Sequence, residues 1–343
     1  MFLRLGVKMR KIKIAQIGTS ENSHGRTIFK SLKEQSDVFE IVGYAFPERE
    51  GEKFADQMPY FEGYAELTVE EILQNPEIEA VTIETEEVYL TKYAQMAADA
   101  GKHIHMEKPG GIDLADFEKL INTMKNSGKV FHTGYMYRYN PCVVELIDKV
   151  RSGKLGEILS VEAQMNCSHN KETRQWMENF PGGILFFLGC HLIDLILLIQ
   201  GMPKRVIPLN KCTGADGVTA EDFGMAVFEY DKGVAFAKVN ALEAGGFFRR
   251  QLVVSGTKGT VELRPLEAYS GEPGSLLYTT KRECYSFDWV DRGESTDSEV
   301  YERYDKMMGS FGAMVRGEKV NPYSYDYELN LYRTILEACG RSF

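Results

Sequence analysis

The sequence AGKHIHMEKPGG at residues 100–111 predicts the end of a helix, a short strand and a loop. Gly101 suits the left-handed conformation in which many helices end. His103–Met106 is expected to be the strand, and Pro109 ends it because proline cannot donate a hydrogen bond to a sheet. Lys108 is thereby placed at the carboxyl end of a strand, the edge of an open parallel sheet at which ligands bind. For the tripeptide Glu107-Lys108-Pro109 taken alone, the alternative is a solvated lysine before a turn.

On both sides of this stretch, apolar strands alternate with amphipathic helices. This alternation predicts a parallel sheet with helices on both faces. The expected strands are Lys11–Gly18, Phe39–Phe46, Ala80–Glu84, His103–Met106 and Lys129–Thr133. The expected helices are Arg26–Gln35, one beginning at Pro47, Leu67–Gln74 with a Thr68/Glu71 capping box, Thr91–Ala100 and Leu114–Ser127.

After residue 133 the pattern changes to successive strands joined by turns, which predicts an antiparallel sheet. The expected strands are Gly156–Asn166, Asp222–Tyr230, Gly233–Leu242, Phe248–Ser255 and Thr260–Leu263, with further helices at Cys142–Ser152, Val300–Arg316 and Tyr325–Gly340. The fold class is therefore α/β: an amino-terminal Rossmann domain, 1–133, and an α+β substrate and oligomerisation domain, 134–343, built on an open, largely antiparallel sheet. The last helix could return to the first domain.

The composition is that of a globular protein long enough for two domains: 343 residues, 43% hydrophobic and 26% charged. The net charge of −10 argues against a nucleic-acid partner. The apolar run Ile184–Gln200 could suggest a membrane span, but His191 and Asp194 at its centre favour a buried helix.

The cysteines and histidines set further bounds. Six cysteines show neither close pairing nor metal-type spacing, which predicts reduced thiols in the core of a cytoplasmic protein. Six histidines form no HExxH or comparable cluster, so no metal is predicted. Residues 1–10 are too short for a secretory signal.

The loop after the first strand should carry a dinucleotide if the first domain binds one. Of the GxGxxG fingerprint only Gly18 and Gly25 remain, with a polar loop between them. The backbone at the start of the next helix can still hold a phosphate, because free N–H groups point there. We therefore expect a pyrophosphate over this loop, bound by Gly18, Thr19, Ser20 and His24.

An acid at the end of the second strand usually binds the ribose, but Phe46 stands there, followed by Glu48 and Arg49. Glu48 could serve NAD and Arg49 the phosphate of NADP; a solvated helix start fits both residues equally well. NAD is favoured over NADP. The other cofactor-binding residues expected at strand ends are Phe46, Thr85, Glu107 and Lys108.

A second candidate cluster lies in GGILFFLGCHLID, residues 182–194. At 3.6 residues per turn, Phe187, His191 and Asp194 share one helix face. A histidine and an acid within an apolar helix need partners or water. His191 could be a structural histidine bonded to the backbone, or a proton donor and acceptor for a hydroxyl or carbonyl.

These motifs together resemble the glucose-fructose oxidoreductase / inositol dehydrogenase family, known as Gfo/Idh/MocA. Glu-Lys-Pro at 107–109, residues 134–141, residues 182–194 and SGTKGT at 255–260 occur in the family's order and spacing. The resemblance covers nearly the whole chain. It implies a Rossmann domain, an open mixed sheet, and NAD(P)-dependent oxidation of a hydroxyl on a sugar, cyclitol or related polyol. It also implies a homodimer or homotetramer paired through the exposed face of the second sheet.

The resemblance further implies that Lys108 and His191 are catalytic and converge on the reacting hydroxyl. His191 would accept the proton, and Lys108 would stabilise the developing oxyanion. The residues expected to bind the substrate are Tyr137, Arg138, Trp176, His191 and Asp194.

Several family positions differ in this chain. The family's Thr-Pro-Asn is Thr85-Glu86-Glu87, its Trp-Arg pair is Trp176-Met177, and the acid four residues before the histidine is Phe187. These departures lie at cofactor and catalytic positions. Two hypotheses follow: a divergent NAD(P)-dependent dehydrogenase or reductase, or a catalytically degraded ligand-binding or regulatory protein on the same fold.

Overall fold

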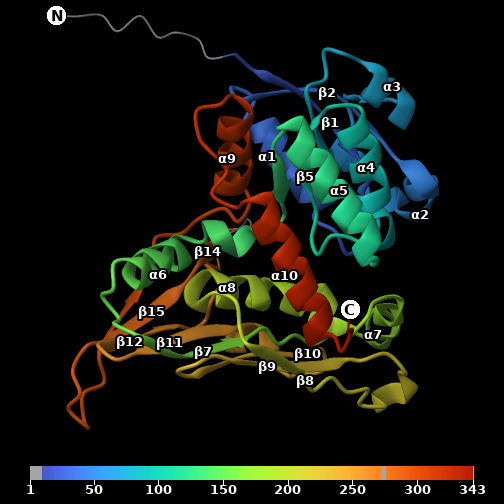
Figure 1. The fold of residues 1–343 in the computed structure, drawn as a ribbon. Coiled ribbons are helices and arrows are strands. Elements are labelled where there is room, and N and C mark those ends of the chain that lie inside the picture. Colours follow the sequence, from blue (N-terminus) through green and yellow to red (C-terminus); the bar gives the residue numbers. More distant parts are fainter. Residues whose placement is uncertain (1–9, 272–275, 343) are drawn as a thin grey trace, which may run out of the picture. The chain divides into compact units, whose positions relative to one another are not determined.

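A computed structural model describes residues 10–271 and 276–342 (Figure 1). The chain folds into two compact units: the residues up to Gly134 with Tyr304–Leu329, and Tyr135–Arg303 with the residues from Asn330. The first division falls one residue from the boundary expected at 133. Residues 304–329 belong to the first unit, whereas the sequence boundary placed them in the second domain. The first nine residues, considered above for a secretory signal, lie outside the described residues.

The first unit is built on a six-stranded parallel sheet in the order β3-β2-β1-β4-β5-β6. This is the doubly wound order, in which ligands bind at the switch point between β1 and β4. The four residues of β4 are all buried, as expected for a central parallel strand. The strands are β1 Ile12–Ile17, β2 Phe39–Ala45, β3 Ala65–Glu66, β4 Ala80–Ile83, β5 His103–Met106 and β6 Phe131–Thr133.

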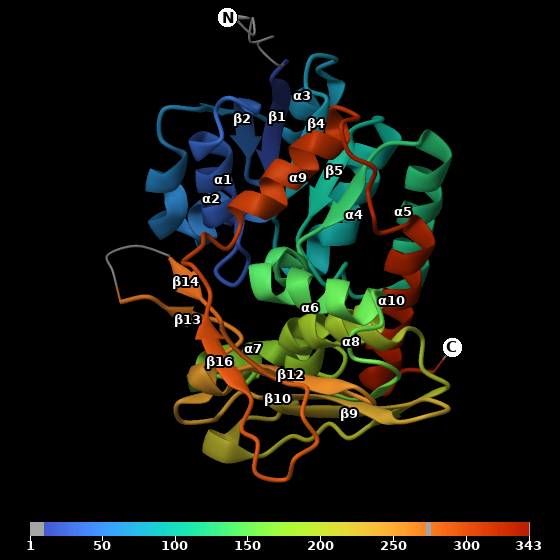
Figure 2. The same ribbon diagram turned by 90° about the vertical axis from the view of Figure 1, so that its left-hand side faces the viewer.

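Helices cover both faces of this sheet. Figure 1 shows α1 and α9 on one side and α4 and α5 on the other, and Figure 2 shows α9 in front of the strands. The capping box at Thr68 is confirmed, and Gly101 has the predicted left-handed φ of 69°. The helices are α1 Gly25–Glu34, α2 Glu50–Lys53, α3 Val69–Gln74, α4 Leu90–Asp99, α5 Leu114–Ser127 and α9 Asp305–Val315.

The helix expected from Pro47 begins only as a 3₁₀ turn, Pro47–Arg49, which is separate from α2. Glu48 and Arg49 have left-handed φ values of 55° and 62°, so the chain makes a tight turn and α2 begins at Glu50. Pro47 and Glu48 belong to this turn, and Glu50 is the first residue of α2. Glu48 and Glu50 therefore have separate contacts, which are described below.

The second unit is built on an eight-stranded sheet in the order β16-β15-β12-β11-β7-β10-β9-β8. The sheet is mixed, because β7 and β10 pair in parallel while the other pairs are antiparallel. The central strands match the expected ones. The strands are β7 Ile158–Gln164, β8 Arg205–Pro208, β9 Phe223–Glu229, β10 Val234–Asn240, β11 Gln251–Gly256, β12 Gly259–Leu263, β15 Thr280–Cys284 and β16 Glu294–Asp297, with β13 Ala268–Tyr269 and β14 Leu277–Tyr278 as a separate hairpin.

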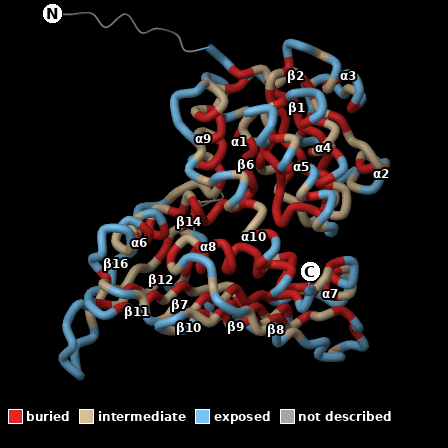
Figure 3. Tube along the Cα trace, in the orientation of Figure 1, coloured by how far each residue is buried: buried red, intermediate tan, exposed pale blue. Residues whose placement is uncertain are grey.

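Helices α6 (Pro141–Arg151) and α8 (Cys190–Gln200) pack on one face of the second sheet. The short α7 is Lys171–Trp176, and α10, Tyr325–Ala338, begins in the first unit and ends in the second. Figure 3 shows buried residues following the strands of each sheet and α8.

The segment 184–200 contains one irregularity that the regular spacing of 3.6 residues missed. Leu185–Gly189 forms a π-helical turn before α8 begins at Cys190. The assumption that Phe187 and His191 are related by one regular α-helical turn is therefore wrong, whereas His191 and Asp194 lie within α8 and share its face. Among the described residues no helix is long and apolar enough to cross a membrane.

Candidate functional site

The loop after β1 is held by side chains of the chain itself. The Thr19 N–H donates to Glu50 Oε2 at 3.2 Å, and the Thr19 hydroxyl donates to Gln57 at 2.5 Å. The Ser20 N–H donates to the Ser23 hydroxyl at 3.0 Å, and the Ser23 N–H donates to the Ser20 hydroxyl at 2.9 Å. The serines that stand where the fingerprint has glycine therefore supply oxygen acceptors to the loop.

Gly18 closes the loop against the segment after β4. Its φ is 91°, and a Cβ there would lie 2.4 Å from Cγ2 of Thr85. Only glycine fits both the conformation and the space. The Ser23 hydroxyl also donates to the Glu84 carbonyl oxygen at 3.1 Å, so these two loops are fixed to each other across the β1/β4 switch point.

A pocket of about 520 Å³ opens at the end of β2. Phe46 lines it and packs against Tyr44 at 4.8 Å between ring centroids. Glu48 also lines it, and its carboxylate accepts hydrogen bonds from Lys92 at 2.5 Å and from the Tyr93 hydroxyl at 2.8 Å. Arg49 points its guanidinium at Glu52 instead. The acid is thus positioned at the pocket, while the neighbouring arginine is paired elsewhere.

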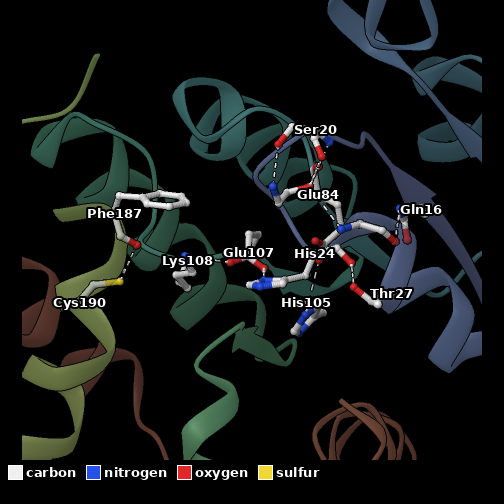
Figure 4. A network of polar contacts seen from close by, with 12 residues as sticks. Gln16, Ser20, His24, Thr27, Glu84, His105, Glu107, Lys108, Phe187 and Cys190 are labelled. Atoms are coloured by element: carbon white, nitrogen blue, oxygen red, sulfur yellow. Dashed lines mark hydrogen bonds and ion pairs between the residues drawn. The ribbon is translucent and has the colours of Figure 1, made fainter. Parts of the chain in front are cut away.

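Buried carboxyl groups gather at the ends of β4 and β5. Lys108 Nζ lies 3.6 Å from Glu107 Oε1, and His24 Nδ1 lies 3.0 Å from Glu107 Oε2, so that the carboxylate lies between the ammonium and the imidazole (Figure 4). Glu84 and Glu87 are 0% and 1% exposed, and no other described residue gives their carboxyl oxygens a hydrogen bond. Uncompensated buried polar atoms of this kind are rare in proteins.

The charges of these groups follow from burial and proximity. Burial raises the pKa of Glu84 well above its ordinary value, and the nearby Glu107 and Glu87 raise it further. Burial also raises the pKa of Glu87 to about 7, although Lys108 opposes this. At Glu107 burial acts in the same direction, but His24 and Lys108 outweigh it and hold the pKa below its usual range. Glu107 therefore carries the negative charge, and Glu84 keeps its proton.

A histidine pair lies beneath this cluster. His105 Nδ1 is 2.8 Å from His132 Nδ1, and His105 Nε2 is 3.6 Å from Glu84 Oε1. Burial lowers the pKa of His105 to about 4, so this ring is neutral at pH 7. Phe311 of α9 stacks on His132 at 5.5 Å. The apolar ring shields the pair from water on that side.

In the second unit, His191 is 1% exposed on α8. Its ring meets the rings of Tyr135 and Tyr137 edge-on, at 5.8 and 5.2 Å between centroids. The Tyr137 hydroxyl donates to Glu267 at 2.6 Å, which fixes the tyrosine that contacts His191. These contacts restrict the orientation of the imidazole.

Arg138 and Asp194 form a buried, bidentate ion pair. Arg138 Nε lies 2.9 Å from Asp194 Oδ2, and Nη2 lies 2.8 Å from Oδ1. Both side chains are about 1% exposed. The acid one helical turn after His191 therefore ties α8 to the segment that carries Tyr135 and Tyr137.

Phe187 and Trp176 are part of an aromatic cluster in the second unit. The Trp176 ring meets Phe180 and Phe187 edge-on at 4.8 and 5.2 Å, and Phe180 stacks on Phe187 at 6.1 Å. An apolar ring thus stands where the resembled family has an acid.

Two family models match the chain. A model described as the oxidoreductase family with an NAD-binding Rossmann fold matches residues 12–135, and a model of the GFO/IDH/MocA C-terminal domain matches residues 143–262. The chain belongs to the Gfo/Idh/MocA oxidoreductase family. The family resemblance and the fold class expected from the sequence are confirmed.

Relatives of this Gfo/Idh/MocA chain include the uncharacterised oxidoreductase YhhX of Escherichia coli, 32% identical over 142 residues, 40% of each protein. The scyllo-inositol 2-dehydrogenase (NADP⁺) IolW of Bacillus subtilis is 26% identical over 166 residues, 48% of this chain and 46% of IolW. The chain thus spans about half the length of the curated relatives it matches. The solved aldose-aldose oxidoreductase of Caulobacter crescentus shares the fold, with a TM-score of 0.77, 21% identity and coverage of 97% of this chain and 99% of that one.

The residues of the first unit fit an NAD(P) dinucleotide at its two ends. The pocket beside Glu48 lies where a Rossmann fold places the adenosine, and Lys108 with Glu107 lies at a strand end suited to the nicotinamide side. Between them, the Thr19 N–H, in the loop after β1, donates to Glu50.

Of the residues predicted from the sequence, the structure brings Gly18, Thr19, Ser20, His24, Phe46, Thr85, Glu107 and Lys108 to the carboxyl edge of the first sheet. Tyr137, Arg138, Trp176, His191 and Asp194 belong to the second unit. Their roles stay predictions. Among residues 10–271 and 276–342, no group of three His, Cys, Asp or Glu side chains is arranged to hold a metal ion.

Sequence reasoning missed Glu50, Glu84 and the Lys92–Tyr93 pair. Glu84 had a usable signal, because an acid directly after the apolar strand Ala80–Ile83 stands at a ligand-binding edge. Glu50 had none, since its position depends on the left-handed turn at Glu48 and Arg49.

Proposed function

We propose that the chain transfers a hydride between a nicotinamide dinucleotide and a hydroxyl or carbonyl carbon of a sugar, cyclitol or related polyol. The observation that carries this proposal is Lys108, whose ammonium is 2% exposed and lies 3.6 Å from the Glu107 carboxylate at the end of β5. A buried, paired lysine at the binding edge of a Rossmann sheet is suited to stabilise an oxyanion.

The oxidation of an alcohol divides two hydrogens between two acceptors: the C–H hydrogen leaves as a hydride and the O–H hydrogen as a proton. The nicotinamide supplies the acceptor for the hydride that leaves the carbon. His191 takes the hydroxyl proton as general base, and Lys108 stabilises the oxygen as the C–O bond gains double-bond character. The tyrosine contacts around His191 serve to orient its ring.

NAD is the proposed cofactor rather than NADP. Glu48 lines the pocket at the end of β2 and is held there by Lys92 and Tyr93. A carboxylate at that place accepts hydrogen bonds from a ribose diol and repels a 2′-phosphate. Arg49, which would favour the phosphate, is paired with Glu52.

The substrate class rests on family membership and on the relative that acts on an inositol. Tyr137 and Trp176 are the proposed contacts for substrate hydroxyls and for its apolar face. Arg138 and Asp194 are proposed to act on the substrate through the segments they join, because each already binds the other.

We also propose a homodimer or homotetramer in the cytoplasm. The face of the second sheet opposite α8 carries half-exposed apolar residues at alternate positions, among them Met225, Val227 and Phe236. Apolar surface of this extent favours association. All six cysteines are free thiols, as is usual in a reducing compartment, but Cys212 is exposed and not in the core as expected. Light scattering should give an oligomer mass for the wild type and a lower mass for Phe236→Glu.

A second candidate, a ligand-binding or regulatory protein without hydride chemistry, is favoured by two observations. Phe187 replaces the family's acid, and the Thr19 and Ser20 N–H groups already have acceptors within the chain. Calorimetry separates the two candidates: no heat with NAD⁺, NADH, NADP⁺ or NADPH at high protein concentration would favour the second.

The experiment that tests the first candidate is a thermal-shift screen with those four nucleotides, followed by a polyol panel that includes scyllo-inositol. A ligand at about 100 times its Kd adds roughly 2.7 kcal/mol, which shifts the melting temperature measurably. With a substrate found, Lys108→Ala and His191→Ala should each lower kcat by about 100- to 10,000-fold. Full kcat in both variants would refute these roles. A gain of polyol oxidation in Phe187→Asp would instead identify a degraded enzyme.

A further inference from the structure

Glu50 is a buried carboxyl group that joins two loops of the nucleotide-binding edge. It is 0% exposed at the start of α2. Its Oε2 accepts a hydrogen bond from the Thr19 N–H at 3.2 Å, and its Oε1 accepts one from the Glu86 N–H at 3.0 Å. One carboxyl group therefore bridges the loop after β1 and the loop after β4, the loops that flank the switch point of the sheet.

The Thr19 N–H belongs to the loop on which a Rossmann fold places a pyrophosphate. When it is ionised, Glu50 gives this donor the same kind of partner, a pair of oxygens sharing a negative charge. The arrangement is fixed by Gln57, which donates to the Ser20 carbonyl oxygen at 2.9 Å and accepts from the Thr19 hydroxyl. The side chain is thus a built part of the loop.

The charged groups that face Glu50 come from two elements. Lys53 of α2 and Glu86 of the β4–α4 loop pair with each other at 2.6 Å. Burial raises the pKa of Glu50 to about 8; the two N–H donors and Lys53 oppose this, and Glu86 adds to it. The two groups that donate hydrogen bonds to the Glu50 carboxyl group are backbone N–H groups and carry no charge. Because Lys53 and Glu86 pair with each other, the ionisation of Glu50 itself sets the net charge around it near neutral pH.

We propose that Glu50 is a specificity-determining residue that occupies the pyrophosphate position, and that a dinucleotide binds there only when the Glu50 carboxyl group is neutral and yields the Thr19 N–H. This inference rests on the proposed function, because it concerns the same nucleotide site. An ionised Glu50 beside a pyrophosphate repels it, and a protonated one can donate a hydrogen bond to it. Binding therefore takes up a proton when the pH is near or above 8.

The test uses ADP-ribose and adenosine as probes, titrated calorimetrically into the full chain between pH 6.5 and 9.5. For wild type, the Kd of ADP-ribose should weaken about tenfold from pH 7 to pH 9, as linkage to one group titrating near 8 requires. Glu50→Gln should bind ADP-ribose with a Kd that is flat over this range. Adenosine, which lacks phosphates, should show no slope with either protein.

Two control variants isolate the effect. Glu52→Gln alters a side chain of the same helix that is 68% exposed, and it should keep the wild-type slope. Glu87→Gln removes another buried carboxyl group of the same edge, whose pKa burial raises to about 7, and it should also keep the slope above pH 8.

A measurement on the wild type alone covers the case in which Glu50→Gln does not fold. Calorimetry at pH 8 in buffers of different ionisation enthalpy should show uptake of about half a proton per ADP-ribose bound. No uptake, or an equal slope in wild type and Glu50→Gln, would overturn the inference and leave the proposed function standing. A slope with adenosine would overturn it as well. Absence of binding of ADP-ribose, NADH and NADPH by every variant would overturn both the inference and the proposed function.

Discussion

Both units bury ionisable side chains, but their hydrogen bonds are completed differently. In the second unit the Asp194 carboxylate meets Arg138 through two hydrogen bonds, and Glu267 accepts from Tyr137, Arg250 and Arg303. In the first unit Glu84 and Glu87 are just as deeply buried, yet no other described residue donates a hydrogen bond to their carboxyl oxygens.

This difference separates two uses of a buried ionisable side chain. A complete, bidentate pair fixes one arrangement of the segments it joins, as Arg138 and Asp194 do for α8 and residues 135–139. A buried acid whose hydrogen bonds are incomplete lowers the stability of the fold, and it persists where it serves binding or proton transfer. Glu84 and Glu87 stand at the carboxyl edge of the first sheet, so we infer that this edge carries chemistry and that the pair beside His191 has a positioning role.

The largest effect is expected from breaking the complete pair. Asp194→Asn leaves the Arg138 charge buried without its carboxylate and should lower the free energy of unfolding by about 3–5 kcal/mol. Urea unfolding followed by circular dichroism measures this loss. The control is the double variant Arg138→Met/Asp194→Leu, which removes both charges and should lose less than Asp194→Asn. A loss below about 1 kcal/mol for Asp194→Asn would contradict the positioning role.

The opposite effect, a gain in the free energy of unfolding, is expected when the buried carboxyl group of Glu87 is replaced. Burial raises the folded-state pKa of Glu87 from 4.5 to about 7, so the stability tied to its protonated form is complete below pH 4.5 and is lost as the pH rises through 7. Glu87→Gln removes this loss. The variant should match wild type at pH 4 and exceed it at pH 8 by on the order of 3 kcal/mol.

Urea unfolding of both proteins at several pH values measures this difference. Glu70→Gln changes an exposed carboxylate of the same unit and serves as the matched control, with an expected pH-independent difference from wild type. Equal stabilities of wild type and Glu87→Gln at pH 8 would show that a partner for Glu87 exists in solution.

The sequence predicted those parts of the molecule that local patterns determine. The apolar strands, the capping box at Thr68 and the helix end at Gly101 follow from residue type and spacing. The edge strand β16 and its neighbour β15 were missed, because TKREC and ESTD are polar and are defined only by their pairing with neighbours. Residue type indicated a strand only where one face of the strand is buried.

The candidate site was predicted less completely for a related reason. Lys108 and His191 stand in recognisable motifs, so they could be singled out without a structure. The pairing of Arg138 with Asp194 joins residues 56 positions apart, and the contact of Glu50 with Thr19 joins residues 31 positions apart. No local rule links such residues, and the π-helical turn at Leu185–Gly189 altered the spacing used for Phe187.

A smaller effect, on the choice between NADP and NAD, is expected at Glu48, an acid of the first unit whose carboxylate does accept hydrogen bonds. Glu48→Gln removes its charge while Lys92 and Tyr93 remain at the pocket. The released Lys92 should then attract a 2′-phosphate, and the ratio of NADP to NAD affinity should rise about tenfold. Fluorescence titration with NADH and NADPH measures the ratio. Glu70→Gln, which also lines the pocket but has no such contact with Lys92 among the described interactions, is the control. An unchanged ratio would remove Glu48 from cofactor choice.

The smallest effect is expected at a pair that is complete but exposed. Lys125 Nζ donates to both carboxylate oxygens of Asp326 at 2.8 and 3.0 Å, distances close to those of Arg138 with Asp194, but the side chains are 51% and 69% exposed. Water solvates both charges in the unfolded and folded chain, and salt screens their attraction. Lys125→Met should therefore change the free energy of unfolding by only about 0.2–1 kcal/mol, and by less in 1 M NaCl. Urea unfolding at low and high salt measures both values. A loss as large as that of Asp194→Asn would mean that pairing geometry, and not burial, sets the cost of breaking an ion pair in this protein.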